Sequence, residues 1–322
     1  MAEKDKFSAP IPVMVLAGPT AVGKTALSLR LAHRIGAEIV SADSVQVYKR
    51  LNIGSAKIRE DQQEGIPHHL IDIIEPTQTF SVNDYTARAT EAIHDIWQRG
   101  HLPLIVGGTG LWIRSVIEGY KFPPKPANPL VTRALLEQQA ARYGWSSIRR
   151  QLFLVDPDSW HHIDPNDHRR LIRALEVYLT TNRRLVRSHH ATSPYRTAYW
   201  VLTRPPVDLA TRVQERVASM LDQGFEREVL DLLQSGVSPR SQSLAAIGYR
   251  DIVDWYFGKS TRAERNLLIV KHTRAYAKRQ LTWWRSERSA HWLDLSAWTP
   301  EDALTVLEES ARNLLLSPDH EA

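Results

Sequence analysis

A glycine-rich segment near the start of the chain has the residue types needed to bind phosphate. Residues 18–25 read GPTAVGKT and follow the apolar run 13–17. Glycines let backbone N–H groups approach phosphate oxygens, Lys24 supplies a positive charge, and the Thr25 hydroxyl is a ligand that Mg²⁺ accepts. The apolar run before the loop and the helical spacing after it are the context that this motif requires. The segment predicts a phosphate or diphosphate site formed by Gly18, Pro19, Thr20, Ala21, Val22, Gly23, Lys24 and Thr25.

The acidic residue that an ATP-hydrolysing enzyme needs beside such a loop is missing from the usual place. The apolar run 102–106 ends in Gly107 and Gly108 rather than in a carboxylate. Asp43 instead follows the strand-like run 38–40, at a position where open α/β sheets bind their ligands. The segment DSVQVY that begins there offers a carboxylate, a hydroxyl, an amide and a ring. These groups can hold a metal ion or read a nucleobase edge, and Asp43 can equally cap a helix.

Alternating short apolar runs and helical patterns predict a parallel α/β fold for the first part of the chain. We expect strands over 13–17, 38–40, 69–74 and 102–106, and a helix that starts after Ser81 with Asp84 as its capping-box partner. A proline-rich stretch then leads into helical segments, before an extended run at 199–202. The prediction is a P-loop NTPase-like core with a parallel sheet over 8–122, a helical insertion over 123–196, and the remainder of the core with C-terminal helices over 197–322.

Composition narrows the classes of protein that this chain can be. It has 322 residues and no cysteine, which excludes a disulfide framework and a thiolate nucleophile and fits the cytoplasm. We find no signal peptide and no apolar run long enough to cross a membrane. The net charge of +5 is unevenly distributed, since 11 Lys and Arg face 4 Asp and Glu between 240 and 288. Such runs are either a solvated helix surface or a site for a polyanion.

Taken together, the motifs resemble the tRNA dimethylallyltransferase (IPP transferase) family. Beyond GPTAVGKT and DSVQVY, the chain contains NIGSAK from 52, GIPHHLID from 65, FSVNDY from 80, GGTGLW from 107, PNDHRRLIRALEV from 165, IGYRD from 247 and AKRQLTWWR from 277. They follow the family's order and span nearly the whole chain. The resemblance implies transfer of a dimethylallyl group from dimethylallyl diphosphate to the exocyclic N6 of the adenosine 3′ to the anticodon of tRNA, with Mg²⁺ as cofactor.

The resemblance also implies roles for individual residues. Asp43 accepts the N6 proton, Thr109 and Arg212 act on the diphosphate, and Thr25 holds the Mg²⁺. The insertion grips the anticodon stem-loop, and the enzyme is expected to be a monomer. The implied tRNA contacts are Asp43, Ser44, Val45, Gln46, Arg133, Arg169, Arg170, Leu171, Ile172, Arg173, Gly248, Tyr249 and Arg250. Helical spacing adds a basic face suited to an RNA backbone, made of Lys271, Arg274, Lys278 and Arg285.

The sequence departs from the family pattern at several positions, and other functions stay open. Arg169 replaces a common glutamine, and Ala245 stands where a polar residue is common, which puts a base contact from 245–246 in doubt. The first alternative is an adenylate isopentenyltransferase that uses free AMP or ADP, although the insertion and both basic runs argue against it. A small-molecule P-loop kinase and an RNA-binding module switched by a nucleotide are the others.

Overall fold

The computed structural model describes residues 10–120, 122, 129–184 and 193–316, and divides the chain into two compact units. The first consists of Met1–Gly119 and Thr192–Ala322, and the second is Tyr120–Ala191. The second unit ends before the predicted 196, because Tyr195 already pairs with Ile11 of the main sheet. Among the helices of the described ranges, none is long and apolar enough to cross a membrane.

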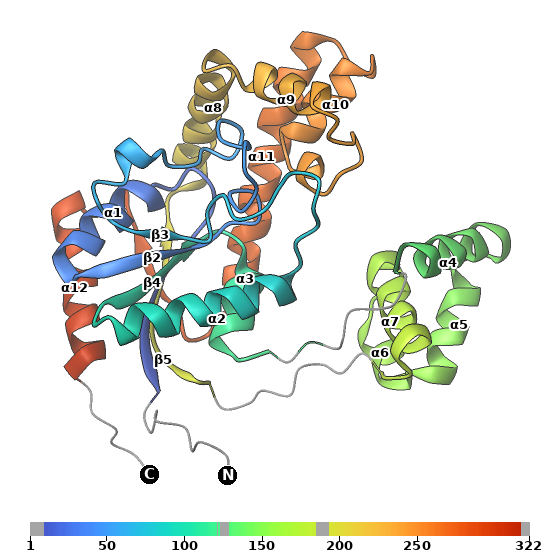
Figure 1. The fold of residues 1–322 in the computed structure, drawn as a ribbon, viewed down its shortest axis with the longest axis horizontal. Helices are drawn as coiled ribbons and strands as arrows, with labels where there is room; N and C mark the ends of the chain where they lie inside the picture. Colours follow the sequence, from blue (N-terminus) through green and yellow to red (C-terminus); the bar gives the residue numbers. More distant parts are fainter. Residues whose placement is uncertain (1–9, 121, 123–128, 185–192, 317–322) are drawn as a thin grey trace. The chain divides into compact units, whose positions relative to one another are not determined.

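Six strands of the described residues form one parallel sheet in the first unit, in the order β3-β2-β4-β1-β5-β6 (Figure 1). The strands are β1 (Ile11–Ala17), β2 (Ala37–Ala42), β3 (His68–His69), β4 (Leu102–Gly107), β5 (Tyr195–Thr203) and β6 (His291–Asp294). The helices of this unit are α1 (Lys24–Ile35), α2 (Val82–Gln98), α3 (Gly110–Ile117), α8 (Pro206–Asp222), α9 (Phe225–Gln234), α10 (Tyr249–Tyr256), α11 (Arg262–Trp284) and α12 (Pro300–Leu316). Both the sheet and its parallel direction agree with the predicted fold class.

Strand β1 is buried along its whole length, which is why its sequence reads as a continuous apolar run. Successive side chains point to opposite faces of a strand, so β1 contributes to two separate cores. Val13 and Val15 belong to the core that includes Ile93 of α2. Met14 and Leu16 belong to the other, which includes Leu31 of α1 and Leu304 of α12. The sheet is therefore fixed from both sides, with α1 and α12 packed against each other on one of them.

Local sequence signals predicted some elements well and one of them badly. The capping box at the start of α2 is confirmed, since Asp84 N donates to Ser81 Oγ and Ser81 N donates to Asp84 Oδ2. The strand predicted over 69–74 is wrong, because the observed strand stops at His69. Leu70 and Asp72 have φ angles of 64° and 55°, in the left-handed region that interrupts an extended chain.

The second unit is helical, as the pattern indicated, and is described here by itself. Its helices are α4 (Pro129–Tyr143), α5 (Trp145–Val155), α6 (Pro157–His162) and α7 (His168–Thr181). Sequence reasoning missed α6, which begins at a cap where Ser159 N donates to Asp156 Oδ1, 3.1 Å away. Leu171 and Leu175 of α7 are buried among Leu136, Ile148 and Leu152. Leu179 has the same four-residue spacing on α7, but it is 58% exposed.

The close approach of β2 and β4 at their carboxyl ends leads to a stability prediction. A Cβ added to Gly107 would lie 2.2 Å from the carbonyl oxygen of Ala42, which is backbone and cannot move aside. We therefore expect Gly107→Ala to lower the free energy of unfolding by about 1–3 kcal/mol. Gly100→Asn is the control, because nothing lies within 4 Å of its Cβ and asparagine tolerates the left-handed φ. Equal denaturant midpoints for the two variants would contradict the steric argument.

Candidate functional site

Three strands that are neighbours in the sheet deliver their following loops to one edge. Ala17 of β1 and Ala42 of β2 both pair with Gly107 of β4. The loop 18–25 follows β1, Asp43 follows β2, and Thr109 follows β4. Segments that lie far apart in the sequence thus meet where parallel sheets bind their ligands.

The phosphate loop folds as its sequence predicts. Gly23 caps α1 with a φ of 112°, a conformation that favours glycine. The ammonium of Lys24 donates to the carbonyl oxygens of Gly18 at 2.9 Å and Pro19 at 2.7 Å. Burial, and then the nearby Arg216, lower the pKa of Lys24 to about 7. An anion that entered the loop would favour the charged form of this lysine.

Asp43 occupies the start of a tight turn rather than of a long helix. Its Oδ1 accepts hydrogen bonds from Val45 N at 2.8 Å and Gln46 N at 3.3 Å. The side-chain amide of Gln46 is fixed in turn, because its nitrogen donates to the Ser55 carbonyl oxygen at 3.3 Å and its oxygen accepts from Ser41 Oγ at 3.4 Å. The helix cap considered from the sequence is therefore absent, because Asp43 caps a turn and no helix begins there. The turn uses one carboxylate oxygen, and no hydrogen bond within the described ranges involves Oδ2.

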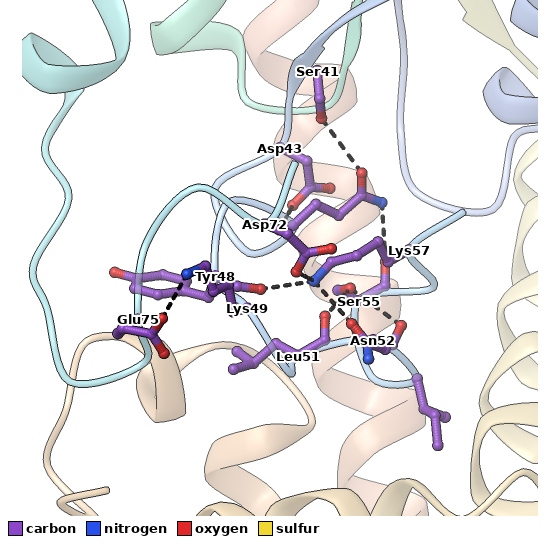
Figure 2. A network of polar contacts seen from close by, with 12 residues as sticks. Ser41, Asp43, Tyr48, Lys49, Leu51, Asn52, Ser55, Lys57, Asp72 and Glu75 are labelled. Carbon is purple, nitrogen blue, oxygen red and sulfur yellow. Dashed lines mark hydrogen bonds and ion pairs between the residues drawn. The ribbon is translucent and has the colours of Figure 1, made fainter. Parts of the chain in front are cut away.

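A buried lysine that sequence reasoning did not single out holds this loop in place. Lys57 Nζ donates to the Tyr48 carbonyl oxygen at 2.7 Å, to Asn52 Oδ1 at 3.0 Å and to Asp72 Oδ1 at 2.6 Å (Figure 2). Burial lowers the pKa of Lys57, and the contact with Asp72 opposes that shift. The lysine therefore ties the turn after Asp43 to the left-handed residues that follow β3. Its signal was its place in the NIGSAK motif.

A carboxylate from α9 completes the support of the same loop. Glu228 accepts from the backbone N–H groups of Asn52 at 2.8 Å, Ile53 at 2.7 Å and Gly54 at 3.1 Å. Its Oε1 also accepts from the hydroxyl of Tyr249 at 2.7 Å. Tyr249 was expected to contact tRNA. Its side chain is fully buried and its hydroxyl is used inside the protein, so a tRNA contact by Tyr249 stays a prediction for its backbone alone.

Helix α11 joins the loops after β1 and β4 through one amide side chain. Gln280 Oε1 accepts from Thr20 N at 2.9 Å, and Gln280 Nε2 donates to the Gly108 carbonyl oxygen at 2.9 Å. The Thr109 hydroxyl accepts from Ser44 N at 3.3 Å, which connects the loop after β4 to the turn after β2. Gln280 belongs to the AKRQLTWWR motif, but its residue type alone did not indicate that its side chain would hydrogen-bond to two different loops.

Two arginines of α8, one turn apart, face the phosphate loop and the Asp43 loop. Arg212 Nε donates to the Ala21 carbonyl oxygen at 3.0 Å, which agrees with its predicted place beside the phosphate loop. Arg216 donates to the Ser55 carbonyl oxygen at 3.4 Å. Burial lowers the pKa of Arg216, and the charge of Asp43 partly opposes that effect. The i, i+4 spacing of the two arginines was the available signal for Arg216.

Two cavities meet at Asp43 and differ in chemistry. The larger, about 520 Å³, has the phosphate loop, Lys24, Arg212 and Arg216 on its walls. The smaller, about 310 Å³, has apolar walls that include Met220 and Phe225. Four residues line both cavities and mark the junction between them, namely Thr20, Asp43, Arg216 and Tyr276. The arrangement can place an anion and a flat apolar or aromatic group on either side of one carboxylate.

The residues predicted to contact RNA in the first unit lie in different places. Gly248 lines the smaller cavity together with Ala245, and Arg250 lies half-buried beyond it. Lys271, Arg274 and Lys278 are exposed on α11. Arg274, Lys278 and Arg285 also line a separate groove of about 420 Å³ between α8 and α11, so the predicted basic face exists.

In the second unit, the predicted RNA contacts fall into two groups. Arg133, Arg169, Arg170 and Arg173 are exposed or partly exposed. Leu171 and Ile172 are 0% and 4% exposed, because they belong to the unit's apolar core. The implied RNA contact of these two residues therefore stays a prediction for their backbone groups alone.

The donors available for a metal ion are few. Thr25 is exposed and lines the larger cavity, which Asp43 also lines. Within the described residues, no cluster of three or more His, Cys, Asp or Glu could hold a metal alone. This composition fits Mg²⁺, which is typically bound through one or two protein groups together with phosphate oxygens and water.

Comparisons with known proteins all indicate the same enzyme family. The family model described as IPP transferase matches residues 46–287. The chain is 44% identical over 305 residues to the tRNA dimethylallyltransferase of Symbiobacterium thermophilum, covering 94% of each chain. It is 42% identical to the protein of the same name from Geobacillus thermodenitrificans, covering 93% of this chain and 95% of the relative.

Solved structures give the same result. The full-length tRNA isopentenylpyrophosphate transferase of Bacillus halodurans matches with a TM-score of 0.70 and 35% identity, covering 94% of this chain and 98% of the other. A eukaryotic dimethylallyltransferase, described as acting on tRNA, matches with a TM-score of 0.80 and 26% identity, covering 97% of this chain and 81% of the other.

The lowered pKa of Lys24 predicts how the loop's affinity for an anion depends on pH. In the free protein the lysine loses its charge as the pH rises through about 7, and a bound anion restores that charge. Binding is therefore coupled to proton uptake and weakens above that pH. Isothermal titration with inorganic diphosphate should show it, with Lys24→Arg as the control because arginine stays charged. From pH 6 to 8.5, we expect the affinity of the wild type relative to that variant to fall roughly tenfold. If the ratio of wild-type to Lys24→Arg affinity stayed constant across this pH range, the lowered pKa of Lys24 would be contradicted.

Proposed function

The chain belongs to the IPP transferase family, and we propose that it transfers a dimethylallyl group from dimethylallyl diphosphate to the exocyclic N6 of the adenosine 3′ to the anticodon of tRNA. The bacterial relatives that it matches over nearly its whole length carry the name of this activity. One observation in the structure supports it most directly. Asp43 stands where a cavity suited to phosphate meets a cavity suited to a base.

The reaction requires a base at that junction. The lone pair of an adenine amino group is delocalised into the ring, so the nitrogen attacks well only if its proton is removed as the new bond forms. N6 attacks C1 of the dimethylallyl group, and the bond from C1 to the diphosphate oxygen breaks with its electron pair on the oxygen. Asp43 accepts the N6 proton. Its Oδ1 is held by two backbone amides, which fixes the carboxylate, and no hydrogen bond among the described residues uses Oδ2.

The larger cavity supplies what the leaving group needs. Diphosphate gains negative charge as its bond to carbon breaks, and preorganised donors stabilise that charge. Lys24, Arg212 and Arg216 line this cavity, so three cations surround the proposed diphosphate position. Thr25 would hold Mg²⁺ there, and the ion would neutralise phosphate charge when bound. We assign Thr109 to positioning, since its hydroxyl accepts from the amide of Ser44 next to Asp43.

The smaller cavity is the proposed place for the adenine. Its walls carry Ser44, Val45 and Gly248, three of the positions implied as tRNA contacts. A base in a loop can be extruded into such a pocket at lower cost than one in a duplex. Ala245 also lines this cavity and adds no hydrogen-bonding side chain, so polar recognition of the base falls to other lining groups, such as Ser44 and Gln242. The anticodon stem is assigned to the helical unit with Arg169 and Arg170, and to the exposed cations of α11.

The alternative functions receive less support. An adenylate isopentenyltransferase needs neither the helical unit nor the basic face of α11, and the curated relatives reported above are named for tRNA. A kinase or an ATP-hydrolysing enzyme would need an acid after β4, where the chain has Gly107 and Gly108. The third alternative, an RNA-binding module switched by a nucleotide, accounts for the cations of the larger cavity but gives no role to the Asp43 carboxylate at the junction of the two cavities.

Replacement of Asp43 tests the proposed function directly. Asparagine keeps the oxygen that accepts from the amides of Val45 and Gln46, so Asp43→Asn should preserve the turn while removing the base. We expect the turnover number to fall by about 10²–10⁴-fold. Binding of tRNA should stay within about twofold of the wild type, because no backbone-phosphate contact is changed.

The readout is nucleoside mass spectrometry of tRNA after incubation with dimethylallyl diphosphate. Asp61→Asn serves as the control, because Asp61 is an exposed carboxylate that pairs with Arg59. Absence of N6-dimethylallyladenosine with the wild-type protein would refute the function. Near wild-type turnover in Asp43→Asn would refute only the role of the base.

Arg216 gives a second prediction, because it borders both cavities. Arg216→Ala should lower kcat/KM for dimethylallyl diphosphate by about 10²–10³-fold, since a buried cation beside the leaving group is lost. Arg227→Ala is the matched control on α9, with a side chain that is 83% exposed. Steady-state kinetics with each substrate varied in turn should place the loss on the diphosphate side. A loss confined to KM for tRNA would contradict this assignment.

A further inference from the structure

The helical unit contains a buried carboxylate that two arginines share. The side chain of Glu176, on α7, is 1% exposed. Its Oε2 lies 2.8 Å from a guanidinium nitrogen of Arg173 and 3.3 Å from one of Arg133. Arg173 is on the same helix, whereas Arg133 is on α4, so Glu176 joins two elements of the unit (Figure 1). The PNDHRRLIRALEV motif includes Glu176, but no role followed from it.

Glu176 holds the positive charges of Arg133 and Arg173 close together. Both nitrogens contact the same oxygen, so the two distances limit their separation to about 6 Å. Two guanidinium groups at that separation repel each other unless an anion lies between them. Glu176 neutralises one of the two charges. The pair with its carboxylate therefore keeps a net charge of about +1 and a fixed geometry.

The pattern of burial indicates which side of this cluster faces a partner. The carboxylate is enclosed, while the side chains of Arg133 and Arg173 are 47% and 38% exposed. Each guanidinium has five N–H donors and uses one of them on Glu176, which leaves donors of both directed to solvent. A buried ion pair is weak evidence for stability, because apolar residues of similar size often stabilise as much or more. The arrangement is better explained by what the exposed donors bind.

We propose that Glu176 is a positioning residue that holds Arg133 and Arg173 together as a clamp for one RNA backbone phosphate. This rests on the proposed function, which makes tRNA the polyanionic substrate. A phosphate has several acceptor oxygens and matches the planar donor array of arginine. In the proposed clamp, the phosphate accepts from the exposed N–H groups of both arginines, while the Glu176 carboxylate accepts from one N–H group of each on the buried side. Because the two arginines are already gathered, less side-chain freedom is lost when the phosphate binds.

The first test separates positioning from bulk charge, because the two predict opposite signs. Glu176→Gln removes a negative charge, which by long-range attraction alone would tighten RNA binding. The clamp predicts the reverse: KM for tRNA rises roughly five- to tenfold, while kcat and KM for dimethylallyl diphosphate stay unchanged. Asp158→Asn removes the same charge from an exposed site in the same unit and should leave KM for tRNA unchanged or slightly lower. An unchanged or lower KM in Glu176→Gln would overturn the proposal.

The second test does not depend on how Glu176→Gln folds. Binding of tRNA is measured at increasing salt for Arg133→Ala, Arg173→Ala and the double variant. Each phosphate contact contributes about 0.9 to the slope of log affinity against log salt for a duplex. If both arginines hold one phosphate, the double variant loses about as much slope as either single variant. A loss twice as large means two separate phosphates and overturns the clamp.

If the wild type transfers no prenyl group, yet binds tRNA and shows the single shared loss of slope described above, the proposed function fails and the clamp stands.

Discussion

The arrangement of the candidate site depends on one electrostatic constraint, which is that the buried Lys57 and the half-buried Lys24 and Arg216 share the charge of one carboxylate, Asp43. Burial lowers the pKa of Lys24, Lys57 and Arg216, and the charge of Asp43 opposes the shift in each case. Desolvated cations without enough counter-charge cost free energy, so the pocket is poised to accept an anion. Lys57 meets part of this need with Asp72, whereas Lys24 and Arg216 line the cavity itself.

The scaffold fixes this charge arrangement through polar contacts that cross between elements. Gln280 from α11 bridges the loops after β1 and β4, and Glu228 from α9 binds three consecutive amides of the loop that follows Asp43. Neither side chain lies on the strands that define the edge of the sheet. The C-terminal helices therefore complete a site whose chemistry is concentrated in the first part of the chain. This dependence accounts for motifs that continue to residue 285.

Sequence reasoning succeeded where a local pattern carries its own geometry. The phosphate loop, the capping box of Ser81 and the apolar run of the first strand depend on neighbours in the chain. The strand predicted over 13–17 is therefore confirmed, two residues shorter than the observed β1, and the loop 18–25 follows it as expected. It failed where geometry is set by distant partners. Leu70 adopts a left-handed φ inside an apolar run that reads as a strand. Tyr249 looked like a recognition residue until its hydroxyl was found on Glu228. Family motifs mark positions that matter, but they do not distinguish a group that touches substrate from one that braces the loop.

The folded-back position of Lys24 has a consequence for turnover. Its ammonium already has two carbonyl oxygens of its own loop, at Gly18 and Pro19. A diphosphate that binds must displace these internal competitors, and they are available again as soon as the anion begins to leave. Lys24 thus exchanges the two carbonyl oxygens for phosphate oxygens, and its ammonium has hydrogen-bond acceptors in both states. Affinity for the diphosphate is lowered by that competition, and the loop returns to its internal hydrogen bonds when the anion leaves.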